Sequence, residues 1–325
     1  MGQTAKFFVM TGLIVASTLA GYLARRRGWV SENAARWLMT AVVVFGYSPV
    51  SFLSIWSIQP KAQDVWLPVF GGLQVLIMAG LGVAAGRMLT RDRQDYGLLG
   101  MLSAVGNTGF TMGGFVIYIV FGLEGLGRGS IYALMWYPMV VLVLYPMGQH
   151  FSGSHQGSLA ALMTKSLFNW RSAGLPISLI GLTLTLSGVP YPKAVVESWH
   201  VVPIIMYIVL PTAYFSIGLR LHVSSLGAMK RLIAALMALR FVAAPALGFA
   251  MLALSGLTAH PLTGASRGVL LINSCVPTAI TAVAVANMFH LRPRNASILF
   301  VCNSLVYLAV VLPVVLWLFA GGEME

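Results

Sequence analysis

Side chains that can bind a polar ligand stand in the middle of a long apolar stretch of this sequence. Residues 97–122 carry Asn107 and Thr108 between Gly106 and Gly109, in a run that is otherwise apolar enough to span a bilayer. Amide and hydroxyl groups donate and accept hydrogen bonds. No carboxylate pair, metal-ligand set or Ser/His pair accompanies them in the apolar segments. The pattern therefore favours a binding site centred on Asn107 over an active site.

A second apolar stretch, residues 268–289, carries Asn273, Pro277 and Thr278. Proline removes a backbone donor and clashes with the preceding turn, so it kinks or breaks a helix. Inside a membrane the freed backbone groups must be satisfied by protein or by a water-filled cavity. Paired helix breaks near the midplane are typical of substrate sites in transporters. The simpler interpretation is an ordinary proline kink in one helix and glycine packing notches in the other.

Arg240 is the only formal charge deep within an apolar stretch, residues 232–256. An arginine at the centre of a membrane helix costs at least about 2.5–3.5 kcal/mol on insertion scales. We therefore expect Arg240 to face a cavity, a group of carbonyls or a substrate. The alternatives are that it reaches back toward the cytoplasm or ties broken helices together. No Asp or Glu lies in an apolar stretch, which disfavours a sodium or proton pathway and suits an anionic ligand.

The elements that must position these residues are membrane helices. Of the 325 residues, 58% are hydrophobic and 9% are charged, against about 25% charged in a typical soluble domain. Apolar runs of bilayer length recur throughout. The predicted spans are residues 7–24, 34–56, 65–86, 97–122, 129–149, 173–189, 199–219, 232–256, 268–289 and 296–320. The first resembles a signal peptide, but its weakly basic start and the arginines that follow favour a retained helix.

Basic residues fall mainly in the loops on one side of these ten spans. Those loops hold Arg25, Arg26, Arg27, Arg36, Arg87, Arg91, Arg93, Lys165, Arg171, Arg220, Lys230, Arg231, Arg292 and Arg294. The opposite loops hold Lys6, Lys61, Arg128, Lys193 and Arg267. The positive-inside rule places both termini outside the cytoplasm of a cytoplasmic membrane. This bias accounts for the net charge of +12, and no nucleic-acid partner is needed to explain it.

Five spans on each side of a cytoplasmic connecting loop, residues 150–172, predict two related halves, residues 1–149 and 173–325. A series in the second span recurs at a constant offset in the seventh: Trp37, Pro49, Ser54 and Ile55 correspond to Trp199, Pro211, Ser216 and Ile217. Because five is odd, a duplicated half enters the membrane in the opposite orientation. The expected fold is an all-α polytopic membrane protein of two inverted five-helix repeats, with broken helices 4 and 9 crossing at mid-membrane.

Motifs along nearly the whole chain resemble the auxin efflux carrier family of plant PIN-like carriers and bacterial carboxylate permeases. They are Asn107-Thr108 with Met112-Gly113, Phe215-Ser216-Ile217-Gly218-Leu219, Arg240-Phe241 with Pro245, and Val276-Pro277-Thr278 with Arg292-Pro293. The resemblance implies scaffold and transport domains, often dimeric, with Asn107, Ser48 and Ser51 facing the substrate. One departure is Gly106, which stands where family members often carry proline.

Together these observations predict a secondary transporter of a small organic anion, such as malate, malonate or an auxin-like acid, that works by alternating access. The alternative is an anion channel or a non-transporting membrane receptor with the same pocket. No phosphate-binding loop of an ATP-driven pump is present. We expect no enzymatic activity, cofactor or metal, and partners limited to the substrate, the lipid bilayer and a second copy in a homodimer. The predicted substrate-binding residues are Asn107, Thr108, Gly109, Arg240, Asn273, Pro277, Thr278, Ser48 and Ser51.

Overall fold

The computed structural model describes residues 3–109, 112–153, 158, 161, 164, 173–219 and 229–320. Within these residues every regular element is helical and no strand occurs. The predicted loop 150–172 lies largely outside the described residues. The chain folds into two compact units. Unit 1 comprises Met1–Lys61, Gly109–Ile131 and Asn169–Leu221, and unit 2 comprises Ala62–Thr108, Tyr132–Phe168 and His222–Glu325.

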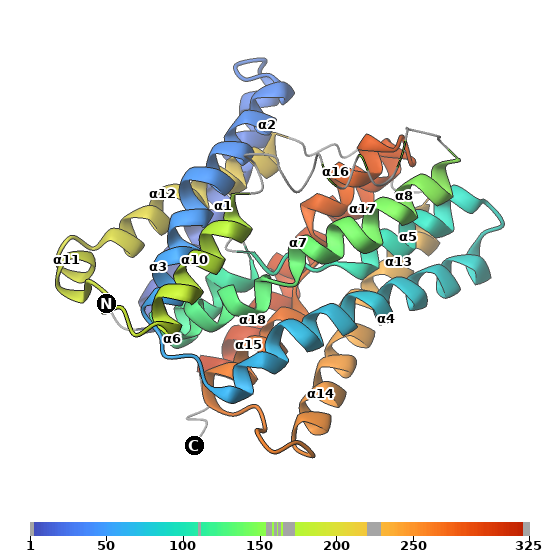
Figure 1. Cartoon of the computed structure of the whole chain (residues 1–325). Helices are drawn as coiled ribbons and strands as arrows, with labels where there is room; N and C mark the ends of the chain where they lie inside the picture. The colour runs from blue at the N-terminus through green and yellow to red at the C-terminus, as the bar shows by residue number, and fades with distance from the viewer. Residues whose placement is uncertain are drawn as a thin grey trace. The chain divides into compact units, whose positions relative to one another are not determined.

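Unit 1 is built from helices of 6 to 24 residues (Figure 1). Its elements are α1 (Gln3–Arg26), α2 (Glu32–Ala41), α3 (Ser48–Trp56), most of α6 (Gly113–Ala133), α10 (Gly174–Leu186), α11 (Lys193–Ser198) and α12 (Val201–Gly218). Helix α6 changes direction at Gly122, whose φ of 62° and ψ of −148° are not helical. Glycine adopts such a positive φ without the steric penalty that a Cβ brings.

Helices α1 and α12 pack closely because glycine lies at their contact. A Cβ at Gly218 would overlap the carbonyl oxygen of Thr18 and lie 2.9 Å from the backbone nitrogen of Tyr22. Small residues allow membrane helices to approach at backbone distance, which strengthens their van der Waals contact. A hydroxyl group connects α12 to α2, since Ser216 Oγ donates to the carbonyl of Ala35 at 2.9 Å. Unit 1 is thus held by close backbone packing and by buried hydroxyl groups.

Unit 2 contains more and shorter helices. They are α4 (Trp66–Leu89), α5 (Arg93–Ala104), α7 (Trp136–Met139), α8 (Tyr145–Ser152), α13 (Lys230–Ala238), α14 (Ala244–Ser255), α15 (Gly264–Cys275), α16 (Ile280–Met288), α17 (Pro293–Val306) and α18 (Leu312–Ala320). Helix α5 lies beside α4, where Ser103 Oγ donates to the carbonyl of Met78 at 3.2 Å. At the start of α15, the buried carboxylate of Asp64 accepts a hydrogen bond of 2.5 Å from Ser266.

In the part of the chain that the structure describes, four helices contain a wider π-helical turn, and each such turn ends two residues before a proline. The turns are Val42–Tyr47, Val140–Leu144, Leu239–Ala243 and Tyr307–Val311, before Pro49, Pro146, Pro245 and Pro313 respectively. Proline has no backbone N–H, so the carbonyl four residues earlier loses its helical partner. In each turn the residue just before the proline donates instead to the carbonyl five residues back. Each wide turn thus accompanies a proline, although Pro211 lies inside α12 without one.

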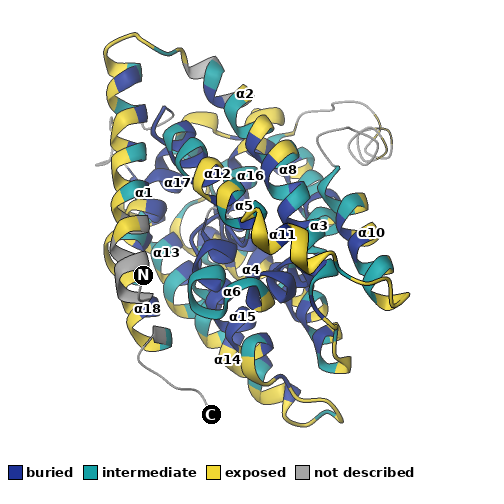
Figure 2. Cartoon of the chain, turned by 90° about the vertical axis from the view of Figure 1, so that its left-hand side faces the viewer, coloured by how far each residue is buried: buried dark blue, intermediate teal, exposed yellow. Residues whose placement is uncertain are grey.

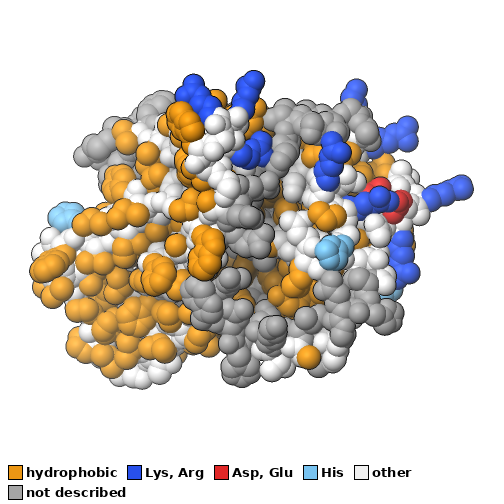
Figure 3. Space-filling model, turned by 90° about the horizontal axis from the view of Figure 1, so that it is seen from above, with side chains coloured by type: hydrophobic (Ala, Val, Ile, Leu, Met, Phe, Trp, Pro, Cys, Tyr) orange, Lys and Arg blue, Asp and Glu red, His pale blue; other side chains and the backbone are white. Residues whose placement is uncertain are grey.

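The exposed side chains of several helices are those of a membrane protein. Trp37 and Phe45 are 69% and 73% exposed, and Trp317 is 75% exposed. Figure 2 shows exposed residues along much of α1, and Figure 3 shows apolar side chains over a broad part of one face, with Lys and Arg side chains projecting elsewhere. Large exposed apolar surfaces are uncommon on soluble monomers and suit contact with lipid.

Six helices in the described part of the chain are long and apolar enough to cross a membrane. They are Trp37–Trp56, Ala62–Leu89, Gly113–Ser152, Val201–Gly218, Lys230–Ser255 and Pro293–Phe319. The all-helical, membrane-spanning class is therefore confirmed. Helices α5 and α15 have 12 residues each, fewer than the ~20 that span a bilayer. The arrangement of ten spans in two inverted repeats stays a prediction, and each compact unit takes segments from both predicted halves.

Candidate functional site

Two helices of unit 2 end in extended segments that pair with each other. Helix α5 ends at Ala104 and α15 ends at Cys275, and the residues that follow them, Val105 and Val276, have extended backbone angles. Gly106 and Thr278 form an isolated antiparallel bridge. These segments contain the Asn107 and Pro277 regions that the sequence singled out, and the structure brings them together.

Backbone hydrogen bonds join the two extended segments on both sides of this bridge. The N–H of Asn107 donates to the carbonyl of Pro277 at 2.7 Å, and the N–H of Ala279 donates to the carbonyl of Val105 at 3.0 Å. Buried backbone groups that lie outside helices need such partners, because an unpaired buried group costs about as much as a lost hydrogen bond. We call the two paired segments, residues 105–107 and 277–279, the crossing. The backbone groups of the two segments bond to each other where the helices no longer supply partners.

Thr278 is fixed further by two buried contacts within unit 2. Its backbone N–H donates to Oδ1 of Asn303 at 2.7 Å, and its hydroxyl donates to the carbonyl of Leu102 at 2.8 Å. Leu102 lies in the last turn of α5, where carbonyls have no partner within the helix. Asn303 and Thr278 are both fully buried. The predicted site residue Thr278 thus holds the crossing in place, and its hydroxyl is already engaged.

Arg240 lies against the ends of the same two helices. Its Nη2 and Nε donate to the carbonyl of Val276 at 2.6 and 3.2 Å, and its Nη1 donates to the carbonyl of Ser103 at 3.2 Å. The side chain is buried, at 1% exposure. The sequence left open whether Arg240 faces a cavity, a group of carbonyls or a substrate. The structure places its guanidinium against carbonyls.

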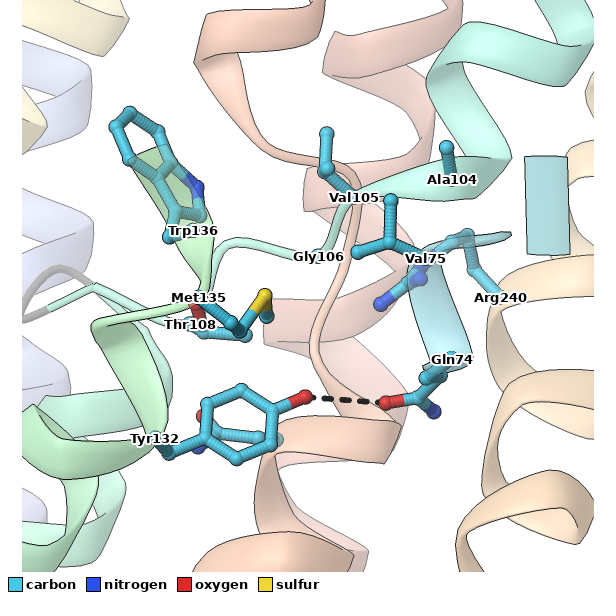
Figure 4. Close-up of a pocket in the computed structure, with 11 residues that line it drawn as sticks. Gln74, Val75, Ala104, Val105, Gly106, Thr108, Tyr132, Met135, Trp136 and Arg240 are labelled. Carbon is cyan, nitrogen blue, oxygen red and sulfur yellow. Dashed lines mark hydrogen bonds between the residues drawn. The ribbon is translucent and has the colours of Figure 1, made fainter. Parts of the chain in front are cut away.

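A small cavity lies beside the crossing in unit 2, and its space is roughly that of one water molecule. It is lined by Gln74, Val75, Ala104, Val105, Gly106, Thr108, Tyr132, Met135, Trp136, Arg240 and Asn273. In Figure 4, Tyr132, Met135 and Trp136 enter from one side, and Gln74 and Arg240 enter from the other. The hydroxyl of Tyr132 donates to Oε1 of Gln74 at 3.1 Å, and Nε2 of Gln74 donates to the carbonyl of Ala244 at 3.1 Å.

Two predicted site residues bring unused hydrogen-bonding groups to this cavity. Among the described residues, neither Nδ2 nor Oδ1 of Asn273 has a hydrogen-bond partner, and the same is true of the hydroxyl of Thr108. Asn273 is 1% exposed and Thr108 is 5% exposed. A buried polar group without a partner costs about 1–3 kcal/mol. Such groups in a native site point to a ligand or an ordered water as the missing partner.

The remaining predicted residues are in unit 1 or in the crossing itself. Pro277 contributes the carbonyl that Asn107 contacts. In unit 1, Ser51 Oγ and Ser178 Oγ are 2.7 Å apart, and Ser48 Oγ donates to the carbonyl of Val43 at 3.1 Å. Both serine hydroxyls therefore have protein partners within their own unit. Gly109 also belongs to unit 1.

Sequence reasoning missed Gln74, Tyr132 and Asn303. Gln74 and Asn303 could have been found by one signal, a single amide in a predicted span, because intramembrane polar groups are expensive without a partner. Tyr132 could not, since it is one of three tyrosines in the predicted span 129–149. Gln74, for example, is the only amide in the predicted span 65–86. No group of three or more His, Cys, Asp or Glu side chains in the described part of the chain is placed to bind a metal ion. Cys275 and Cys302 are free thiols.

Comparison with known proteins gives one match. The model of a family described as membrane transport protein matches residues 8–318, which is most of the chain. No curated protein matches it.

Proposed function

We propose a specific transport function from the premise that the chain belongs to the membrane transport protein family, the family of the auxin efflux carriers. The chain is therefore a multi-pass membrane protein of a transporter family. Within that family, we infer that it is a secondary transporter of a small organic anion. The substrate is a mono- or dicarboxylate such as malate, malonate or an auxin-like acid, and it moves across the cytoplasmic membrane by alternating access.

The observation that carries this proposal is the pair of unused polar groups at the cavity of unit 2. The amide of Asn273 and the hydroxyl of Thr108 offer hydrogen-bond donors there. None of the eleven lining residues is acidic, and one, Arg240, is a cation. A cavity with donors and positive potential, but without a carboxylate, suits an anion better than a cation.

The substrate carboxylate would accept hydrogen bonds from Asn107, Thr108 and Asn273, close to the backbone of Pro277 and Thr278. Arg240 would add positive potential from behind the crossing. Ser48, Ser51 and Gly109 stay predicted substrate-binding residues from the sequence. In this proposal the extended segments after α5 and α15 are the breaks of helices 4 and 9, which cross at mid-membrane between two inverted repeats. Both termini would lie outside the cytoplasm, and the protein would form a homodimer.

Transport of labelled acids into proteoliposomes tests the proposal. Malonate, malate and an aromatic acid would be compared for the wild-type protein and the Asn273→Ala variant. The matched control is Asn287→Ala, because Asn287 is an exposed asparagine of the same unit. We expect saturable uptake of at least one acid, reduced at least about 10-fold by Asn273→Ala and unchanged in the control.

Two results would contradict the proposal. Ohmic anion currents in planar bilayers, without saturable exchange, would assign an anion channel instead. Binding of an acid without any transport would assign a membrane receptor. Equal uptake by wild type and by Asn273→Ala, for every transported acid, would remove this cavity from the substrate site while leaving the transport function intact.

A further inference from the structure

We propose that Arg240 is a positioning residue that holds the crossing of the two extended segments together, and that Gly106 is the residue that makes room for it. The role of Arg240 in transport rests on the proposed function, whereas the close approach of Arg240 and Gly106 does not. Arg240 would act on the substrate without a direct contact, through the backbone that it fixes and the potential of its charge. This assigns Arg240 a task different from direct capture of an anion.

The hydrogen bonds of Arg240 connect two chain segments that are far apart in the sequence. One carbonyl, that of Ser103, belongs to the last turn of α5, and the other, that of Val276, follows α15 directly. The planar guanidinium presents its N–H donors in a rigid fork, so one side chain can engage both carbonyls at once. Arg240 thereby joins the ends of both helices, as the hydroxyl of Thr278 does through the carbonyl of Leu102.

The charge of Arg240 is matched by the helix ends that it contacts. The C-terminus of a helix carries a partial charge of roughly −0.5. Two such ends, those of α5 and α15, therefore offset the single positive charge of the guanidinium. Among the described residues no Asp or Glu forms an ion pair with Arg240. The carbonyls are what makes burial of this cation possible, since a buried charge without partners is far more costly.

Gly106 lies where the guanidinium needs space. A Cβ at this position would overlap Nη2 of Arg240 and would lie 2.7 Å from Cγ2 of Val276. A Cβ essentially never comes that close to a heavy atom, so any larger residue at 106 would displace the guanidinium or the Val276 segment. Gly106 also pairs with Thr278 in the bridge, which fixes its backbone beside Arg240. The two residues are therefore matched in this chain, and a proline or alanine at position 106 is incompatible with Arg240 in its present place.

Hydrogen–deuterium exchange of the ligand-free protein tests the positioning role without any substrate. The reporters are the amides of Asn107 and Ala279, which form the two backbone hydrogen bonds beside the bridge. We expect Arg240→Met to speed exchange at both amides by at least about 10-fold, because it removes three hydrogen bonds from a charged donor. Arg240→Lys should give a smaller increase, since an ammonium lacks the fork. Lys230→Met, an exposed cation on the adjoining helix α13, is the control and should change neither amide.

A double-mutant cycle tests the match between the two residues. Gly106→Ala alone should speed exchange at the same amides by at least about 10-fold, because the new methyl group displaces the guanidinium. In Gly106→Ala combined with Arg240→Lys, the shorter cation leaves room for the methyl group. If the two substitutions acted independently, the rate increases of the single variants would multiply. The double variant should instead exchange at least about 3-fold more slowly than that product. Additive effects would overturn the match.

Transport and binding assays separate this inference from the proposed function. If Arg240 captured the anion directly, Arg240→Lys would raise the KM or Kd for the acid while both amides stayed protected. That result would overturn the positioning role and leave transport in place. Increased exchange in the variants, in a protein that transports no acid at all, would instead support the positioning role and contradict the proposed function. Should Arg240→Met fail to fold, Arg240→Lys and Gly106→Ala still report on both amides.

Discussion

The side-chain oxygen of Asn303 accepts a hydrogen bond of 2.7 Å from the backbone N–H of Thr278. This N–H belongs to an extended segment and has no helical partner, so the amide of α17 takes the place of a missing turn. The relationship is structural, because both residues are fully buried and the amide nitrogen of Asn303 contacts Sδ of Met237 at 3.3 Å.

The first prediction concerns Asn303. Asn303→Leu keeps the size of the side chain but leaves the N–H of Thr278 buried without a partner. We expect the free energy of unfolding to fall by about 1–3 kcal/mol, measured as a lower Tm of the purified protein. An unchanged Tm would show that the N–H of Thr278 finds another acceptor.

The second prediction is the opposite behaviour of Asn273, the other buried amide. Neither polar atom of the Asn273 side chain has a partner among the described residues. Asn273→Leu should therefore leave the free energy of unfolding unchanged or raise it by up to about 2 kcal/mol, measured as an unchanged or higher Tm. The same variant should lose the thermal stabilisation that the proposed carboxylate substrate would give to the wild-type protein. A Tm lowered as far as in Asn303→Leu would show that the amide of Asn273 has a structural role.

The third prediction compares two glycines of α4. A Cβ at Gly82 would overlap Ser103 Oγ and lie 2.8 Å from the Cα of Gly100, whereas a Cβ at Gly80 would have no heavy atom within 4 Å. Gly82→Ala should lower the stability by about 1–3 kcal/mol through overpacking against α5. Gly80→Ala, the matched control, should raise it by about 0.4–1 kcal/mol. Thermal unfolding of both variants measures the difference, and equal effects would contradict the close packing of α4 on α5.

The fourth prediction concerns pH and the ion pair at the start of α5. Burial alone would raise the pKa of Asp92, but the N–H of Gln94 and the charge of Arg292 outweigh it and lower the pKa below its usual 3.8. The ionised carboxylate therefore stabilises the folded state above pH 3.8, and this contribution is lost as the pH falls through the folded pKa. Arg292→Gln should lower the free energy of unfolding at pH 7 by less than about 1 kcal/mol, because the side chains of Arg292 and Asp92 are both more than a third exposed. This loss would be measured as a slightly lower Tm. The difference from wild type should shrink near pH 3, and a constant difference would mean that Arg292 acts through packing.

Much of this architecture follows from apolar runs alone. The helical, membrane-spanning class and the family were predicted from the sequence and are confirmed. The sequence also located two places where a helix ends within an apolar stretch, because Gly106 and Pro277 weaken a helix by different means. Local composition reports where a helix can end, and the ends of α5 and α15 lie within two residues of those positions.

The partners within the site could not be predicted in the same way. The contact of Arg240 with the carbonyl of Ser103 and that of Thr278 with the carbonyl of Leu102 depend on packing between residues more than 100 positions apart in the sequence. Asn273 and Asn303 look alike in the sequence, since each is an amide in an apolar span. Only the folded structure distinguishes the amide that is bonded from the amide that is not.

The wide turn Leu239–Ala243 sets the rotational phase of Arg240 relative to α14. Each residue of an α-helix advances by about 100° around the axis, and the turn holds one residue more than an α-helical turn would. Deleting a single residue there, such as Val242, would let the helix close into regular α geometry and shift Arg240 around the helix axis with respect to α14. The proline two residues beyond the turn thus fixes more than a bend, because it keeps the face that carries Arg240 in register with the ends of α5 and α15.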